Sequence, residues 1–387
     1  MASHRSPLAR PWNRLLVGAA AGSLVLAAAG CSSGGSGSDT ASAGGGDLSA
    51  AQQECVDKAS AFLDERGLLP ETLPEGLTPL SKPPTEGLTI SRLSPGSVPT
   101  SVALSNKIVE LAPEIGWTGK NVTYDGSVED LNRKALEAMD SSDIVVVDGI
   151  PTAAIQEPIR VAQEKGVLLL DGSISEAPVS VPGFGGTPYG GDTFDKLGEV
   201  AMNGILQANN CQGGVAVFSL PVPNLQSEGD TMEAILAEEC PDCAFSYTDI
   251  PFSDIGSPAA TNAVVSKLQS DPSIKFAYFT IGDLAVGLGP ALKQAGIDVQ
   301  IGGAIPVPQN LDATKAGENE FWLGFPQETS AWNILDTAAR ALDTGEPVVG
   351  NHYPVPMYTP DNIEVTDHIP AYPQDMGEQY KELWQLN

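Results

Sequence analysis

Residue types that carry catalytic or metal chemistry are scarce in this chain. Beyond residue 30 the histidines are His352 and His368. The sequence has no GxxxxGK(S/T) phosphate loop, no GxGxxG after a strand, no HExxH zinc motif, no GxSxG elbow and no EF-hand loop. The adjacent carboxylates Glu238 and Glu239 belong to the outer face of a predicted helix, where solvation explains them better than acid–base work. We therefore expect a protein that is not an enzyme and uses no cofactor or metal.

Four of the five cysteines suggest disulfide chemistry. Cys240-Pro-Asp-Cys243 has the spacing of a redox CxxC pair, half a zinc site or a local structural disulfide. A zinc site needs two more ligands nearby, and none is present. A thioredoxin-type pair precedes a helix, whereas this pair follows a helical pattern over 232–239. We interpret Cys240–Cys243 as a structural disulfide and keep Cys55–Cys211 as a candidate second bond.

The fifth cysteine, Cys31, follows an export signal. Residues 1–14 are basic and polar, and residues 15–29 are almost wholly apolar but too few to span a bilayer comfortably. Leu26-Ala-Ala-Ala-Gly30-Cys31 resembles a bacterial lipobox, whose cysteine becomes the first mature residue and carries a diacylglycerol. The alternative is an ordinary cleaved signal, but a flexible Gly/Ser run follows at once. The prediction is a signal peptide over 1–30, lipidation at Cys31 and a tether over 31–46.

The charge balance narrows the classes of partner. Lys plus Arg number 20 against 49 Asp plus Glu, a formal net charge of −29. Phosphate contacts need clustered cations, so we expect no nucleic-acid partner and no basic membrane-binding patch. Hydrophobic residues at 42% exclude a disordered chain, and 387 residues suffice for two domains with cores.

From the export signal and Cys31, we place the protein at the cell membrane, lipid-anchored on its extracytoplasmic face.

Strands and helices alternate along most of the chain. After an N-terminal helix and a Pro-rich linker over 47–86, strands are predicted at 88–90, 121–124, 143–147, 167–170, 215–218, 245–250, 276–279, 299–301 and 321–323. Helices are predicted at 98–115, 127–139, 152–162, 225–239, 259–268, 284–292, 331–342 and 376–386. Strands 143–147 and 167–170 are apolar on both faces, which is typical of a parallel sheet covered by helices on both sides. A Gly/Pro-rich stretch at 178–191 divides the pattern into two doubly wound α/β lobes.

This series of segments resembles a known family. A lipobox, a tether and two βα lobes are the plan of ABC-transporter substrate-binding lipoproteins of the type I periplasmic-binding fold, in the ribose- and sugar-binding branch. Segments 122–150, 162–171 and 266–296 are similar to that family's strand–helix units. Cys240-Pro-Asp-Cys243 and residues 332–340 are similar to an actinobacterial subset. The resemblance covers about residues 87–363.

The resemblance implies three crossings between lobes, near 173–181, 325–327 and 353–357. It assigns 87–175 and 328–354 to lobe 1, and 176–327 and 355–387 to lobe 2. In open α/β sheets ligands bind beyond the carboxyl ends of the strands, so the site is expected between two lobes that close on it. The candidate ligand-binding residues are Val98, Pro99, Thr100, Asp148, Ile150, Asp171, Pro221, Asn224, Thr280, Asp283, Pro306, Gln309, Phe325 and Gln327.

These loops depart from the family's sugar sites. Sugar binders of this type stack the faces of the sugar on aromatic rings near the first loop. This chain has Val98, Pro99 and Thr100 there, and none of them is aromatic. Ile281 and Ala304 occupy the positions at which the family's sugar binders have an Asn and an Asp that form hydrogen bonds with sugar hydroxyls. A ligand hydroxyl that is buried without a hydrogen-bond partner costs on the order of 1–3 kcal/mol. These loops therefore favour a partly apolar small molecule over a hexose. The polar candidates have a structural alternative, because Asp after a strand often caps the next helix or turn.

The resemblance implies a function and leaves alternatives. The expected protein is a lipid-anchored monomer that captures a small-molecule solute and delivers it to an ABC permease. A solute-sensing lipoprotein that acts on a signalling partner is the second hypothesis. An extracellular enzyme is the third, and the scarcity of histidine and the lack of a nucleophile elbow argue against it.

Overall fold

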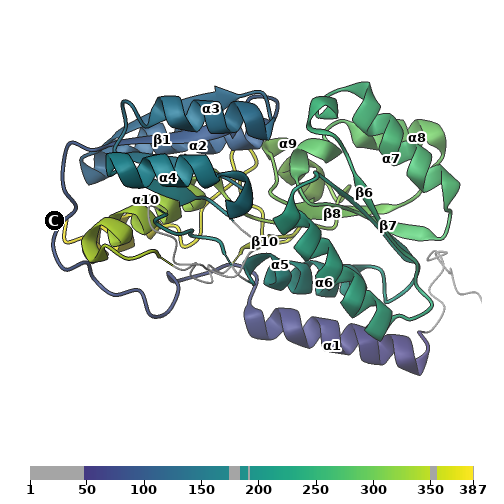
Figure 1. Cartoon of the computed structure of the whole chain (residues 1–387). Helices are drawn as coiled ribbons and strands as arrows, with labels where there is room; N and C mark the ends of the chain where they lie inside the picture. The colour runs from purple at the N-terminus through teal and green to yellow at the C-terminus, as the bar shows by residue number, and fades with distance from the viewer. Residues whose placement is uncertain (1–47, 174–183, 191, 349–354, 387) are drawn as a thin grey trace, which may run out of the picture. The chain divides into compact units, whose positions relative to one another are not determined.

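A computed structural model describes residues 48–173, 184–190, 192–348 and 355–386 (Figure 1). The predicted signal peptide, the lipidation site Cys31 and the tether lie outside these residues. So do most of the predicted crossing at 173–181 and the start of the one at 353–357. Within the described part, no helix is both long enough and apolar enough to cross a bilayer.

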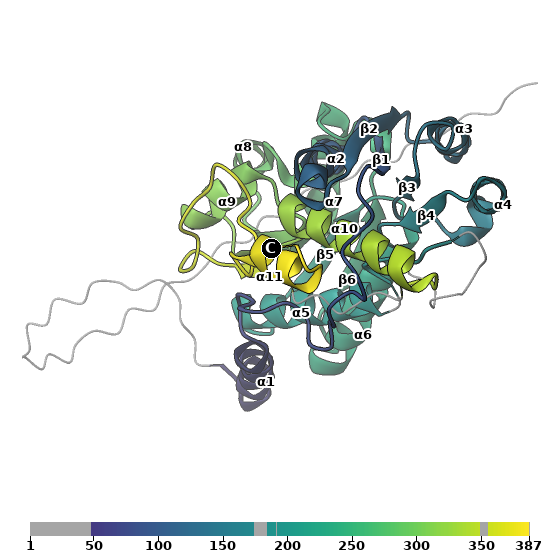
Figure 2. The same ribbon diagram turned by 90° about the vertical axis from the view of Figure 1, so that its left-hand side faces the viewer.

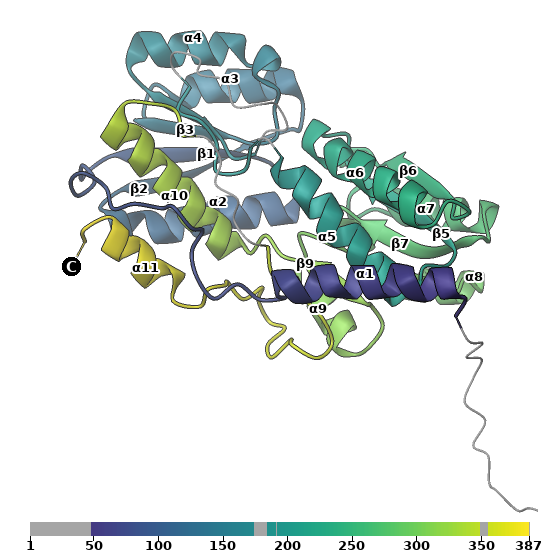
Figure 3. The ribbon, with the colours of Figure 1, turned by 90° about the horizontal axis from the view of Figure 1, so that it is seen from below.

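The first lobe is built on a parallel sheet. Its strands are β1 (Thr89–Pro95), β2 (Thr118–Tyr124), β3 (Ile144–Val147) and β4 (Leu168–Asp171), in the order β2-β1-β3-β4. Its helices are α2 (Pro99–Leu111), α3 (Val128–Ala138), α4 (Gln156–Lys165) and α10 (Gln327–Thr344). Helices α3 and α4 lie on one side of the sheet, with α2 and α10 on the other (Figure 3).

Alternation along β3 explains this double covering. Val145 and Val147 pack in the cluster that contains α3 and α4, whereas Ile144 and Val146 pack toward α2. All four side chains are fully buried, because successive residues of a strand point to opposite faces. The continuous apolar run that predicted a doubly covered strand therefore has its expected cause.

The second lobe has a mixed sheet. Its strands are β5 (Gly214–Ser219), β6 (Phe245–Asp249), β7 (Ile274–Phe279), β8 (Gln300–Ala304), β9 (Phe321–Leu323) and β10 (Met357–Tyr358), in the order β10-β9-β8-β7-β5-β6. Only β10 among these is antiparallel. Its helices are α5 (Thr193–Ala208), α6 (Pro223–Glu239), α7 (Pro258–Ser270), α8 (Leu288–Ala295) and α9 (Pro308–Lys315). The predicted class, α/β with two doubly wound lobes, is confirmed.

Helices α5 and α9 were absent from the sequence prediction. Helix α5 is buried on most of its surface, between α1 on one side and α6 with the sheet on the other, so only a narrow polar stripe marks its outer face. The stripe consists of Lys196, Glu199, Asn203 and Gln207. Its glycines also argue for a loop when the sequence is taken alone. Gly198 has a packing role instead, since a Cβ there would lie 2.5 Å from the carbonyl oxygen of Glu228 on α6.

Residues 184–189 lie beside the first lobe, although the domain prediction assigned them to the second. Phe184 bridges to Leu169 of β4, and Tyr189 bridges to Ser173 just beyond it. Gly186 in turn bridges to Val348. The φ of Gly186 is 99°, and a Cβ at this position would lie 1.9 Å from the Val348 carbonyl oxygen, so only glycine fits there. The stretch extends the edge of the first sheet before α5 begins.

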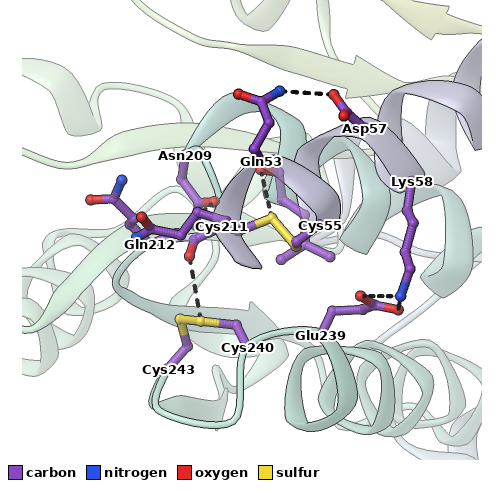
Figure 4. The surroundings of a disulfide bond; sticks show 12 residues. Gln53, Cys55, Asp57, Lys58, Asn209, Cys211, Gln212, Glu239, Cys240 and Cys243 are labelled. Atoms are coloured by element: carbon purple, nitrogen blue, oxygen red, sulfur yellow. Dashed lines mark hydrogen bonds and ion pairs between the residues drawn. A yellow bond between two sulfur atoms is a disulfide. The ribbon is translucent and has the colours of Figure 1, made fainter. Parts of the chain in front are cut away.

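Helix α1 (Ala50–Arg66) packs on α5 of the second lobe. A disulfide joins Cys55 to Cys211, and the Gln207 amide donates to Ser60 over 3.0 Å. Lys58 pairs with Glu239 of α6, and the Cys240–Cys243 disulfide lies next to this contact (Figure 4). The predicted Cys240–Cys243 bond and the candidate Cys55–Cys211 bond are both present.

The chain then crosses from the second lobe to the first. The Leu68 carbonyl accepts from Met357 of β10 over 2.7 Å. Ten residues later, the Thr78 carbonyl accepts from Arg340 of α10 over 2.7 Å, and Ser81 bonds Asp343 on the same helix. The Pro-rich linker is thus a strap between lobes, additional to the predicted crossings.

The C-terminal segment is divided between the lobes. Strand β10 extends the second sheet, but α11 (Met376–Leu383) packs on α10 of the first lobe (Figure 2). The Tyr380 hydroxyl donates to Asn333 and the Trp384 indole to Asp336, each over 2.8 Å. The domain prediction placed 355–387 wholly in lobe 2; these buried bonds hold α11 to lobe 1.

Candidate functional site

A cavity of about 140 Å³ lies between the lobes at the carboxyl ends of their strands. The first lobe contributes Val98 and Thr100 at the start of α2, together with Asp148 directly after β3. The second lobe contributes Ile281 after β7 and Ile305 after β8. Walls from both lobes make this position suitable for holding a small molecule.

A buried ion pair forms the polar edge of the cavity. Arg92 of β1 is fully buried and pairs with Asp148, whose side chain keeps 28% of its exposure. A second Arg92 nitrogen donates to the Ser105 hydroxyl over 2.8 Å. The Ser173 hydroxyl donates to Asp148 over 2.8 Å and accepts from the Asn224 amide, across the lobes, over 2.9 Å. A buried guanidinium needs such a counter-ion, so Asp148 has a structural duty beside any contact with ligand.

Aromatic side chains form another wall. The rings of Tyr189 and Phe325 meet edge to face with centroids 5.1 Å apart, and Phe194 stacks on Phe325 at 6.0 Å. The Tyr189 hydroxyl accepts from the Asn333 amide over 2.6 Å and lies 3.4 Å from the Ser330 hydroxyl. The aromatic rings therefore line the cavity, while the Tyr189 hydroxyl forms its hydrogen bonds with α10.

Another hydrogen bond joins the lobes beside the cavity. The Thr100 hydroxyl donates to the Asp283 carboxylate over 2.6 Å, and both residues are buried. Burial raises the pKa of Asp283, while the hydrogen bond from Thr100 opposes that shift. The contact couples the N-terminus of α2 in the first lobe to the loop after β7 in the second.

Comparisons with known proteins identify the fold. Neither a protein-family model nor a curated protein matches this sequence. Among solved structures, a glucose-galactose binding protein from Geobacillus stearothermophilus superposes with a TM-score of 0.60 at 16% identity, covering 73% of this chain and 100% of that one. An ABC transporter solute binding protein from Mycobacterium smegmatis, with bound glycerol, gives 0.61 at 16%, covering 73% and 99%. Another from Bacillus halodurans, with bound myo-inositol, gives 0.58 at 14%, covering 78% and 99%.

This chain has the type I periplasmic-binding fold. The fold predicted from the order of strands and helices is therefore confirmed. The narrower resemblance to an actinobacterial subset stays a prediction.

Within this periplasmic-binding fold, some predicted site residues line the cavity and others do not. The lining includes Val98, Thr100, Asp148, Phe325 and Gln327. Asp283 and Asn224 do not line the cavity, but they form hydrogen bonds with the lining residues Thr100 and Ser173. The predicted residues outside the lining are Pro99, Ile150, Asp171, Pro221, Asn224, Thr280, Asp283, Pro306 and Gln309.

Two of the polar candidates are bonded within the protein, and ligand contact at these positions stays a prediction. The Asp171 carboxylate accepts from the backbone amides of Gly149, Ile150 and Ser173, which fixes the loops after β3 and β4. The Thr280 hydroxyl donates to Ser219 over 2.8 Å, and both are buried. These are the turn and strand-end roles that short polar side chains often fill.

The prediction missed Arg92, Tyr189 and Phe194. Arg92 is the one cation in β1, and the predicted strand stopped at Ile90, two residues before it. The arginine continues a strand in which six of seven residues are buried, and a buried cation requires a partner. Tyr189 and Phe194 flank the start of α5, which was not predicted, so nothing directed attention to them. Within the described residues, no cluster of three His, Cys, Asp or Glu side chains could hold a metal ion.

Proposed function

We propose that this protein is a membrane-anchored, extracytoplasmic solute-binding protein that captures a small molecule between its lobes and delivers it to an ABC importer. The observation that carries the proposal is the cavity whose walls come from both lobes. Binding there would favour the closed arrangement, because the ligand contacts both lobes only when they meet.

Three further features support the proposal. The solved structures with this fold include sugar and solute binding proteins of ABC transporters. Two disulfides suit an oxidising compartment outside the cytoplasm, as the predicted export signal requires. The lipobox-like sequence before Cys31 supports the anchor.

Uptake by intact cells tests delivery. Cells that lack the protein should lose accumulation of its solute, and the wild-type chain should restore it. Ile281→Trp fills the cavity from the second lobe and should fail to restore uptake, whereas Val286→Trp, on an exposed side chain five residues later, should succeed. Solute binding without any uptake defect would refute delivery and favour the sensing hypothesis.

Fractionation tests the anchor separately. The mature wild-type protein should partition into the detergent phase and carry the mass of a diacylglycerol on Cys31. Cys31→Ala should lack this added mass. A mature wild-type protein without the diacylglycerol mass on Cys31 would refute lipid anchoring while leaving solute binding intact.

A further inference from the structure

Most polar groups around the cavity are already paired within the protein. Arg92 is neutralised by Asp148, and the Ser173 hydroxyl also donates to Asp148. Thr100 donates across to the second lobe, and the Tyr189 phenol is bonded to α10. A ligand hydroxyl that displaced none of these bonds would find few partners.

Several polar groups of the described lining remain open to a ligand, among them the Ser101 and Ser330 hydroxyls, which only accept within the protein, and the Arg92 Nε, which has no partner. Asp148 and Gln327 are the two that the inference uses. From the described residues each Asp148 oxygen accepts one hydrogen bond, which leaves further lone pairs on a partly exposed carboxylate. The Gln327 amide has no hydrogen-bond partner among the described residues, and it lines the cavity. Among the described residues that line the cavity, Arg92 and Asp148 are the charged pair, and they balance each other.

Most of the remaining lining is apolar, with Ser101 and Ser330 as exceptions. The apolar side chains include Val98 and Leu104 from the first lobe, Ile281 and Ile305 from the second, and Phe194 and Phe325. A ring with hydroxyls on every carbon would bury several of them against these side chains without partners. A ligand with a largely apolar surface would not.

The backbone at Ile305 supports an apolar role independently. Its φ is 49°, in the left-handed region that a β-branched residue rarely adopts. Its amide bonds the Leu323 carbonyl over 2.9 Å, and its carbonyl accepts from Gly282 over 3.0 Å, so the conformation is held from both sides. Strained positions of this kind concentrate at functional sites. Here the strain sets an isoleucine in the cavity wall, where Asn or Gly would be easier to accommodate.

From these observations we infer that the solute is a neutral, compact ring compound, apolar over most of its surface, with one or two hydrogen-bond donors on one edge. The donor edge faces Asp148 and Gln327, and the apolar body lies against Ile305 and the Phe194–Phe325 pair. The volume of about 140 Å³ agrees, because an apolar protein cavity of ~150 Å³ holds a benzene-sized molecule. This inference rests on the proposed function, since it describes the solute of that site.

Ring compounds matched in size but not in polarity test the inference. Cyclohexanol has one hydroxyl and myo-inositol six, while phenol and benzoate compare a neutral with an anionic ring. Thermal unfolding and calorimetry use the full mature chain. Cyclohexanol or phenol near saturation should raise the Tm by at least ~2 °C, and myo-inositol, glucose and benzoate should not.

A variant at the strained position sharpens the test. Ile305→Asn removes the apolar side chain but suits the left-handed backbone, so the free protein should keep its Tm. Its affinity for cyclohexanol should fall at least tenfold. Val286→Asn, on an exposed side chain of the same lobe, should keep both Tm and affinity.

The contradictory outcomes are distinct. Binding of myo-inositol or glucose, without cyclohexanol or phenol, would overturn the inferred class and leave the proposed function standing. An equal response from wild type and the cavity-filled Ile281→Trp would show a general solvent effect and overturn the inference. No response to any probe would overturn it as well, and the uptake experiment would then decide the proposed function alone.

Discussion

At the scale of single residues, the protein buries ionisable side chains in and near the site. Arg92 has no exposed surface, and Asp148 is its counter-ion. Glu228 of α6 is also fully buried, and its carboxylate accepts from the Tyr278 hydroxyl over 2.6 Å. A buried charge is tolerated only when it is paired or neutralised, so both positions should respond sharply to substitution.

Asp148→Asn should destabilise the protein strongly. It leaves the Arg92 guanidinium buried without a counter-ion, which costs roughly 3 kcal/mol in comparable pairs. Urea unfolding measures the change. Asp140→Asn is the control, because its pair with Lys165 is solvent-exposed and should matter little. Equal effects of the two substitutions would show that the buried pair has no special importance.

Glu228→Gln should flatten the dependence of stability on pH. Burial raises the pKa of Glu228 to about 8, against an ordinary value of 4.5. Between these values the unfolded chain releases the proton that the folded chain keeps, so stability falls as pH rises and changes no further above about 8. Gln cannot ionise, so the variant should be the more stable one near pH 8.

Urea unfolding at several pH values checks this prediction. Glu233→Gln, at an exposed position of the same helix, should keep the wild-type slope. A wild-type slope in Glu228→Gln would mean that Glu228 is not the group that titrates.

At the scale of elements, the terminal segments bind parts of the fold that are far apart in sequence. Helix α1 is fixed to the second lobe, the strap after it to the first, and α11 to α10. The Cys55–Cys211 bond closes a loop with a sequence separation of 156, whereas Cys240–Cys243 spans 3. The longer loop restricts the unfolded chain far more.

Replacing Cys55 and Cys211 together by Ser should therefore lower stability by up to about 5 kcal/mol on the chain-entropy account. The matched control replaces Cys240 and Cys243 by Ser, with an expected loss of about 2 kcal/mol. Urea unfolding without reductant gives both values. A greater loss in the control would show that the α1 bond adds little constraint.

The elements also show what the sequence could and could not predict. The apolar run of β3 and the turn at Ser127 before α3 were sufficient, because strand burial and helix capping are encoded locally. Helix α5 was not predictable in this way, since its burial depends on α1, which is bonded to Cys211. The cavity was located from strand ends, but Tyr189 enters it only because residues 184–189 pair with β4, a tertiary contact without a local pattern.

At the scale of the whole binding unit, residues 48–386, the two lobes meet around the cavity. Thr100 and Asp283 bond across one part of the contact, and Asn224 and Ser173 across another. These bonds form only when the lobes are together, so they favour the closed arrangement.

Thr100→Val should loosen that contact without changing side-chain volume much. It leaves the buried Asp283 carboxylate without the Thr100 donor, at a cost of about 1–3 kcal/mol. Spin labels at the exposed Val128 and Val286 should then report a broader distribution of interlobe distances. Thr118→Val, at an exposed position of β2, should leave the distribution unchanged. An unaltered distribution in Thr100→Val would show that this bond does not hold the lobes.

The most direct test of the central claim is the small-molecule content of the protein itself. The mature chain is purified from its own cells without denaturation, then unfolded, extracted and analysed by mass spectrometry. Wild type, Val286→Trp and Val109→Phe should release one compound in near-equimolar amount, because their substitutions lie on exposed side chains. Ile281→Trp and Val98→Phe fill the cavity from opposite lobes and should release none. Equal recovery of the compound from all these proteins would contradict binding between the lobes.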